Sequence, residues 1–256
     1  MEQRATFNRV AALYDSARPG YPAALVEDVI AFAGVRSGDP VLEVGCGPGQ
    51  ATMSFAHRGF HLTALDPGEA LLAKARERVG SDPNVAFVHA PFEAWQADGA
   101  EFSLIFAAQS WHWIPRELSF AKAADLLAPN GALAVFGHVP GALSEPLASQ
   151  FETITRRHTG RWGPPPEAGY RPSGPLAEWF DASGRFERAV HRSYAWTWRH
   201  TGASYVDFAR TRSDHQMQPE AVREALLAEV RDAIAANGDA FDWPYETHLY
   251  MARVRA

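Results

Sequence analysis

The stretch at residues 41–49, which reads V-L-E-V-G-C-G-P-G, decides how the rest of the chain is interpreted. Its apolar residues Val41, Leu42 and Val44, which Glu43 interrupts with a charge, are typical of a strand that is buried on both faces of a parallel sheet. Three glycines follow within residues 45–49, and glycine is used where the backbone turns with a positive φ or approaches a ligand closely. A helical pattern begins after residue 49. The unit is a strand, a glycine loop and a helix, which places a nucleotide-like ligand at the carboxyl end of the strand.

A second signal lies at Asp66. A second strand is expected over residues 61–65, and Asp66 ends it. An acidic residue about 20 positions after the glycine loop is placed to accept hydrogen bonds from ribose hydroxyls. The glycine spacing is G-x-G-x-G, whereas dinucleotide-binding proteins use G-x-G-x-x-G. The two signals together favour a ribose-containing ligand other than a dinucleotide.

The motifs E-V-G-C-G-P-G at 43–49 and L-D-P at 65–67 resemble those of the class I S-adenosylmethionine-dependent methyltransferases, specifically the small-molecule type 11 group. The resemblance implies an α/β fold with a Rossmann-like, doubly wound, seven-stranded and mostly parallel sheet whose last strand is reversed. It also implies an N-terminal lid helix and an insertion before the sixth strand. The resemblance covers nearly the whole chain and is weakest across residues 138–185.

The N-terminal part fits this resemblance. Apolar residues at helical spacing predict a helix over residues 7–14, and Y-D-S-A-R-P-G-Y-P follows at 14–22. The type 11 group has Y-D-x-x-R-P-x-Y-P at this place, which implies a lid over the cofactor. Tyr14 and Arg18 could then hold the carboxylate of the methionine moiety. The alternative is that Tyr14 is a packing residue and Arg18 a surface charge.

Further cofactor contacts are expected after the third strand. The family often carries an acidic residue followed by Ala-Glu near the adenine ring, but this chain reads H-A-P-F-E at 89–93 and matches only at Glu93. Phe92 could cover the ring face instead, or could belong to the core. The resemblance implies a cofactor-binding set made of Tyr14, Arg18, Glu43, Gly45, Cys46, Gly47, Gly49, Asp66, Pro67, Phe92, Glu93, Ala108 and Gln109. Cys46 is interpreted as a small loop residue rather than a nucleophile.

The acceptor is expected beside the fourth strand, which ends in A-A-Q-S-W-H-W-I-P at 107–115. The type 11 pattern of small residues followed by His-Trp matches here, so Trp111, His112 and Trp113 are predicted to bind the acceptor. In an extended chain the two tryptophans point one way and His112 the other, unless the backbone turns. His112 suits a general base near neutral pH, or it is a wall residue without proton transfer, so the catalytic residue stays open.

We expect a single domain with four parts. Residues 1–33 form the N-terminal lid and helix, 34–137 the cofactor-binding core, 138–185 an insertion that caps the substrate, and 186–256 the last strands and helices. Within the last part, periodicity predicts strands at 186–196 and 247–254, and helices at 203–212 and 219–236.

Composition restricts the class of protein. The 256 residues carry a net charge of −6, which argues against a general nucleic-acid binder. No run of about 18 apolar residues exists, so a membrane span is not expected. No apolar segment follows Met1, so no secretory signal is expected, and the single cysteine excludes an internal disulfide and fits a reducing cytoplasm.

Charge is uneven along the chain. Residues 150–215 carry ten arginines, no lysine and seven acidic residues, a net +3 that leaves −9 for the rest. This segment could favour an acidic substrate, or it could be a solvated surface. The histidines are not spaced as metal ligands, so no metal is expected.

The predicted function is transfer of a methyl group from S-adenosyl-L-methionine to a small-molecule acceptor, with S-adenosyl-L-homocysteine as the product. The methylated atom, O, N or C, is not determined, and neither is the oligomeric state. Two alternatives stay open. One is a non-catalytic module that binds S-adenosylmethionine, and the other is a nicotinamide-dependent oxidoreductase, which the G-x-G-x-G spacing and Glu43 disfavour.

Overall fold

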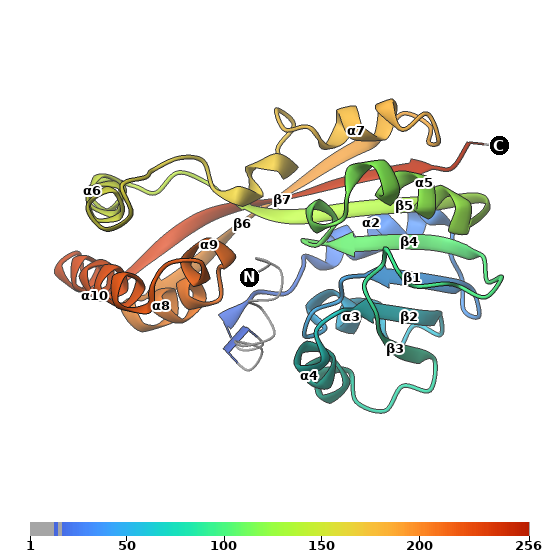
Figure 1. The fold of residues 1–256 in the computed structure, drawn as a ribbon, viewed down its shortest axis with the longest axis horizontal. Helices are drawn as coiled ribbons and strands as arrows, with labels where there is room; N and C mark the ends of the chain where they lie inside the picture. The colour runs from blue at the N-terminus through green and yellow to red at the C-terminus, as the bar shows by residue number, and fades with distance from the viewer. Residues whose placement is uncertain (1–12, 15–16, 256) are drawn as a thin grey trace.

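The computed structural model describes residues 13–14 and 17–255 (Figure 1). The predicted helix over residues 7–14 therefore lies outside the described residues, apart from its last two positions. None of the described helices is long and apolar enough to cross a membrane.

The centre of the molecule is a seven-stranded sheet in the order β3-β2-β1-β4-β5-β7-β6. All neighbouring strands run parallel except β7, which is antiparallel to both β5 and β6. The expected fold class, a mostly parallel α/β sheet with a reversed last strand, is confirmed. The strands are β1 (Pro40–Val44), β2 (His61–Asp66), β3 (Val85–His89), β4 (Phe102–Ala108), β5 (Leu127–Pro140), β6 (Val190–Thr201) and β7 (Ala240–Arg253).

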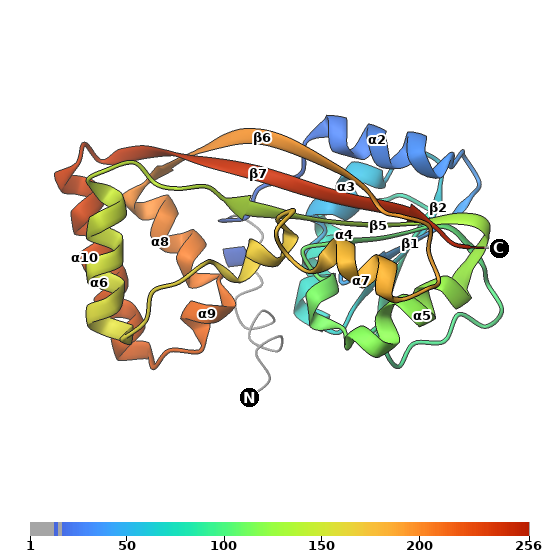
Figure 2. The same cartoon turned by 90° about the horizontal axis from the view of Figure 1, so that it is seen from above.

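Helices cover both faces of the sheet (Figure 2). The described α-helices are α2 (Ala23–Ala33), α3 (Gln50–Phe55), α4 (Glu69–Val79), α5 (Arg116–Leu126), α6 (Leu147–Thr159), α7 (Leu176–Ala182), α8 (Gly202–Arg210), α9 (Ser213–Gln216) and α10 (Glu220–Ala236). Short 3₁₀ helices, η2 (Trp111–Trp113) and η3 (Pro166–Tyr170), follow β4 and α6. The segment between β5 and β6, which was predicted as an insertion, holds α6, η3 and α7.

The apolar runs of the central strands are explained by burial on both faces. Along β4, Leu104 and Phe106 pack in the cluster under α2 and α3, whereas Ile105 and Ala107 pack in the cluster under α5 and α7. Successive side chains of a strand point to opposite faces, so a strand covered on both sides needs apolar residues at every position. This is why β1 and β4 are mostly apolar, with Glu43 and Ser103 as the polar exceptions.

The two last strands are longer than predicted. β7 pairs with β5 only from Tyr245 onward, but it pairs with β6 along the whole stretch from Ala240 to Met251. Beyond β5 the pair therefore continues as a two-stranded ribbon. The predicted strands at 186–196 and 247–254 are wrong in their bounds, because β6 lies at the sheet edge with alternate residues exposed and the ribbon leaves the sheet.

At one end of the molecule α6, α8 and α10 lie beside the ribbon (Figures 1 and 2). A third apolar cluster lies between these helices and the ribbon. Phe151 of α6, Tyr205 of α8 and Val230 of α10 belong to this cluster together with Trp243 of the ribbon. We call α6, α8, α9, α10 and this ribbon the cap. The helix predicted over 203–212 ends at Arg210, and the helix predicted over 219–236 begins at Glu220, with Pro219 as its N-cap.

Candidate active site

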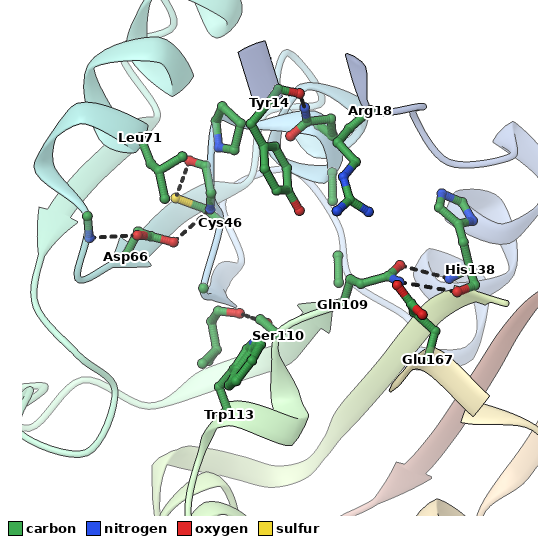
Figure 3. A pocket seen from close by; sticks show the side chains of 18 of the residues that line it. Tyr14, Arg18, Cys46, Asp66, Leu71, Gln109, Ser110, Trp113, His138 and Glu167 are labelled. Carbon is green, nitrogen blue, oxygen red and sulfur yellow. Dashed lines mark hydrogen bonds between the residues drawn. The ribbon is translucent and has the colours of Figure 1, made fainter. Parts of the chain in front are cut away.

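A cavity of about 390 Å³ opens at the carboxyl ends of β1, β2 and β4. The strand order reverses between β1 and β4, and open α/β sheets bind ligands at such a switch point. The glycine loop and the ends of β2 and β4 form one part of the wall, while the N-terminal segment and the cap form the rest. Figure 3 shows Tyr14 and Arg18 reaching into the cavity opposite Gln109, Ser110 and Trp113.

The glycine loop and Asp66 form one hydrogen-bonded unit. Gly45 and Gly47 have φ values of 71° and 55°, which a residue with a side chain rarely adopts. Asp66 accepts hydrogen bonds from Gly47 N at 2.8 Å and from Gly68 N at 2.7 Å. Burial raises the pKa of Asp66, and the two backbone N–H groups oppose that shift. Each carboxylate oxygen keeps a free lone pair with which it can accept a hydrogen bond from a ligand.

Most of the predicted cofactor-binding residues line the cavity. These are Tyr14, Arg18, Gly45, Cys46, Gly47, Asp66, Pro67, Phe92, Glu93, Ala108 and Gln109. Cys46 is buried, and burial raises the pKa of its thiol well above the usual value, so the sulfur is held as a neutral thiol. This fits a small loop residue rather than a nucleophile.

Two of the predicted residues are not on the wall. Glu43 is completely buried beneath the loop. Burial raises the pKa of Glu43 to about 8, with the nearby Asp66 adding to the shift and the Thr52 hydroxyl opposing it. Gly49 is the N-cap of α3, and a Cβ there would lie 3.1 Å from Ala75 Cα in α4. Both residues support the loop from behind and neither lines the cavity, so their contact with the cofactor stays a prediction.

The predicted acceptor residues are separated by η2. Trp111 is only 2% exposed and packs on Phe120 in the core, while His112 is exposed and its Nδ1 lies 3.1 Å from the Tyr170 hydroxyl. Only Trp113 lines the cavity. Successive side chains of a 3₁₀ helix point about 120° apart, so three neighbours cannot face one cavity. That the three residues bind an acceptor stays a prediction, in which only Trp113 has a place on the cavity wall.

The sequence analysis missed the cap side of the cavity. Its wall residues include Glu167, Trp198, Phe208, Arg212 and Tyr245. The Arg212 guanidinium pairs with Glu167 at 3.3 Å and with Asp214 at 3.1 Å. The alternation of tryptophans in W-T-W at 196–198 was a signal of an extended strand, but no sequence pattern shows that this strand passes the cavity.

His138 on β5 ties the N-terminal segment to the sheet. Trp196 Nε1 donates to Thr247 Oγ1 at 3.0 Å, and the same hydroxyl lies 2.8 Å from His138 Nδ1. His138 Nε2 lies 3.2 Å from Gly20 O, and a carbonyl oxygen can only accept, so the proton is on Nε2. Burial lowers the pKa of His138 to about 3. The imidazole is therefore neutral, and both of its nitrogens are engaged.

Gln109 completes this side of the wall. Its φ of 60° follows the end of β4, and its side-chain amide pairs with the His138 backbone, through Nε2 to O at 3.2 Å and Oε1 to N at 2.8 Å. Across the part of the chain that the structure describes, no three His, Cys, Asp or Glu side chains gather in a way that could hold a metal.

Comparison with known proteins agrees with this geometry. Residues 41–131 match the model of a family described as a methyltransferase domain. Trans-aconitate 2-methyltransferase of Escherichia fergusonii is 38% identical over 98 residues, which is 37% of this chain and 37% of that protein. The probable S-adenosylmethionine-dependent methyltransferase CRG1 of Saccharomyces cerevisiae is 27% identical over 137 residues, 52% of this chain and 46% of that protein. The chain thus spans less than half the length of these curated relatives.

Solved structures share the fold over a longer range. A putative type II methyltransferase from Anaeromyxobacter dehalogenans superposes with a TM-score of 0.61 at 23% identity, covering 93% of this chain and 97% of that one. Phosphoethanolamine N-methyltransferase 2 of Haemonchus contortus was solved with phosphomonomethylethanolamine and S-adenosylhomocysteine. It superposes with a TM-score of 0.57 at 16% identity, covering 99% of this chain and 60% of that one. The resemblance to class I S-adenosylmethionine-dependent methyltransferases is confirmed. Residues 41–131 carry the sequence of a methyltransferase domain, and the whole chain has the fold of these structures.

Proposed function

We propose that this protein transfers a methyl group from S-adenosylmethionine to a small-molecule acceptor. The observation that carries the proposal is the glycine loop tied to Asp66 at the switch point of the sheet, within the segment that matches a methyltransferase domain. The cavity continues past this loop to an aromatic wall in the cap, so one enclosed space offers room for a cofactor and an acceptor.

The loop fits the cofactor. A Cβ added at Gly47 would meet no other atom within 4 Å, although Gly47 lies on the cavity wall. The missing side chain therefore leaves open the space that a ligand needs beside the backbone. In this proposal Asp66 accepts from the ribose hydroxyls, Phe92 and Glu93 lie beside the adenine ring, and Tyr14 and Arg18 hold the methionine carboxylate.

The protein's part in the reaction is alignment. The bound cofactor would supply a methyl group on a sulfonium, which is already activated for displacement. The loop and the N-terminal segment would fix that methyl group, and Trp113, Trp198 and Phe208 would enclose the acceptor and exclude water. Alignment of this kind accelerates a displacement without a covalent intermediate on the protein.

The cavity favours an acceptor that needs no base. The imidazole on the described part of the wall, His138, is neutral with both nitrogens engaged, and Glu167 pairs with Arg212. A carboxylate attacks without first losing a proton, whereas most alcohols and ammonium groups must be deprotonated. The relatives named trans-aconitate methyltransferase act, by that name, on a carboxylic acid. We therefore propose a small organic acid as the acceptor.

The test has two stages. Calorimetric titration with S-adenosylmethionine and with NAD should show binding of the first alone, because the loop spacing and Asp66 suit a single nucleoside. Turnover is then followed as S-adenosylhomocysteine release with trans-aconitate, other di- and tricarboxylates, and primary amines of similar size. Binding without turnover on any acceptor would indicate a non-catalytic module, and turnover with amines alone would contradict the carboxylic acid.

A further inference from the structure

The guanidinium of Arg18 is held in place by the cap, although Arg18 belongs to the N-terminal segment. Its Nε donates to Thr211 Oγ1 at 2.9 Å, and its Nη2 donates to Thr211 O at 3.3 Å. Thr211 follows α8 and is completely buried. The Thr211 hydroxyl in turn donates to Phe208 O at 2.6 Å, which fixes its rotamer. One edge of the guanidinium is therefore bound by a single cap residue.

Aromatic rings lie over the guanidinium as well. Its Cζ is 4.8 Å from the centroid of the Tyr14 ring and 4.8 Å from that of Phe208. Contact with ring faces at this distance is favourable for a guanidinium, more so where water is partly excluded. With one edge hydrogen-bonded and rings packed against it, the group has little freedom to reorient before a ligand arrives.

The charged neighbours of Arg18 differ from those of Arg212. Arg212, which also lies on the cap wall, pairs with Glu167 and Asp214, whereas Arg18 forms no ion pair with any carboxylate of residues 13–14 and 17–255. Its remaining N–H groups border the cavity (Figure 3). A fixed guanidinium whose remaining N–H groups border the cavity matches the geometry of a carboxylate, which accepts two parallel hydrogen bonds.

We propose that Thr211 is a positioning residue for cofactor binding: through its hydroxyl, the cap orients Arg18 toward the carboxylate of the methionine moiety. The inference rests on the proposed function and adds that the cap, which encloses the acceptor, also sets the affinity for the cofactor. Thr211 itself does not line the cavity and acts only through Arg18.

The test uses Thr211→Val, which keeps the shape and removes the hydroxyl, and Thr211→Ser, which restores the hydroxyl. Each protein is titrated calorimetrically with S-adenosylhomocysteine and with 5′-methylthioadenosine, which shares the nucleoside and sulfur but lacks the amino-acid carboxylate. Thr211→Val should weaken the binding of S-adenosylhomocysteine about 3- to 10-fold, the scale of one indirect hydrogen bond to a charged group. Thr211→Ser should bind S-adenosylhomocysteine as tightly as the unsubstituted protein does. Methylthioadenosine should bind all three proteins with the same affinity.

Matched controls separate positioning from damage. Thr153→Val removes an exposed hydroxyl of α6 in the same cap and should change nothing. In an Arg18→Gln background, Thr211→Val should have no further effect on S-adenosylhomocysteine, because the group it orients is gone. If Thr211→Val does not fold, Thr211→Ala tests the same point, since alanine also removes the hydroxyl that holds Arg18 and leaves Arg18 itself unchanged.

Several results would overturn the inference. If Thr211→Val binds both ligands more weakly by the same factor, the substitution has damaged the cavity in general. Unchanged S-adenosylhomocysteine affinity with a raised KM for the acceptor would assign Arg18 to the acceptor's carboxylate instead. Normal S-adenosylhomocysteine binding by Thr211→Val refutes only the positioning role, whereas no binding by the unsubstituted protein refutes the proposed function and this inference together.

Discussion

The glycine loop and the cap wall lie on opposite sides of one cavity, yet the chain builds them differently. The loop is fixed by the bond between Gly47 and Asp66, which are 19 positions apart. The cap wall is fixed by contacts such as that of Arg18 with Thr211, which are 193 positions apart. Local contacts order a few residues, whereas contacts across the chain exist only when the whole fold is in place. We therefore expect the loop to determine cofactor binding and the cap to tune it and select the acceptor.

The largest expected effect is at the loop. Gly47→Val should weaken S-adenosylmethionine binding roughly 1,000-fold in calorimetric titration, because a branched side chain would enter the open space beside the backbone. Gly80→Val is the matched control. Gly80 has a similar φ of 67° and also faces open space, but at the end of α4 and outside the cavity wall. The control should lose stability through the same backbone strain and keep its affinity. Equal loss of affinity in both would mean that Gly47 acts through folding.

The acid beneath the loop should make stability depend on pH. The pKa of Glu43 is raised from 4.5 to about 8 in the fold, so between these values the unfolded chain ionises while the folded chain stays neutral. Stability contributed by the neutral acid is complete below pH 4.5 and is lost as the pH rises to about 8. Glu43→Gln does not titrate. From pH 5 to 8 the unfolding free energy of the unsubstituted protein should therefore fall by about 3–4 kcal/mol relative to that of Glu43→Gln. Denaturant unfolding measures this, and the exposed Glu27→Gln should show no such trend.

Asp66 should affect binding more than folding. Asp66→Asn removes the negative charge and should weaken the binding of S-adenosylmethionine about 10- to 30-fold, the scale of a charge-assisted hydrogen bond. Asp82→Asn is the matched control, because Asp82 also accepts hydrogen bonds from backbone N–H groups, of His57 at 2.6 Å and Asn84 at 3.0 Å, away from the cavity. If calorimetry gives the same affinity for Asp66→Asn as for the control, Asp66 is a structural residue only.

On the cap side, Trp198→Leu should raise the KM for the acceptor about 5- to 10-fold and leave cofactor affinity unchanged, because Trp198 contributes apolar surface to that part of the wall alone. Trp162→Leu, at an exposed position outside the cavity, serves as the control. A drop in cofactor affinity with Trp198→Leu would break the division between the two sides.

The smallest effect is expected at His112. His112→Ala should change turnover by less than about 3-fold, because the exposed ring contacts Tyr170 and is not on the cavity wall. A general base would cost about 100- to 10,000-fold in turnover. A loss of turnover of that size in steady-state kinetics would show that His112 acts as a general base.

The same division explains what the sequence could predict. The first strands, the loop and Asp66 were predictable because buried strands, glycine turns and an acidic strand end are local patterns. The position of Trp111 in the core was not, since a three-residue helix turns the chain where alternation was the guide. The cap wall was missed because Trp198 and Arg212 reach the cavity only through the ribbon, whose pairing of β6 with β7 no local pattern determines.

The place of β7 has a consequence for how the molecule is made. β7 lies between β5 and β6, and β6 has no other partner in the sheet, so β6 cannot dock before β7 is present. During synthesis, β1 to β5 and the loop can pair as soon as residue 140 has left the ribosome, whereas the cap has to wait for residues 240–253. For that interval the emerging chain carries a cofactor cradle without its cap, with the free edge of β5 open to wrong partners. Ligand capture by such a nascent intermediate would then be weak, and a chaperone that covers β5 would assist the chain most at this stage.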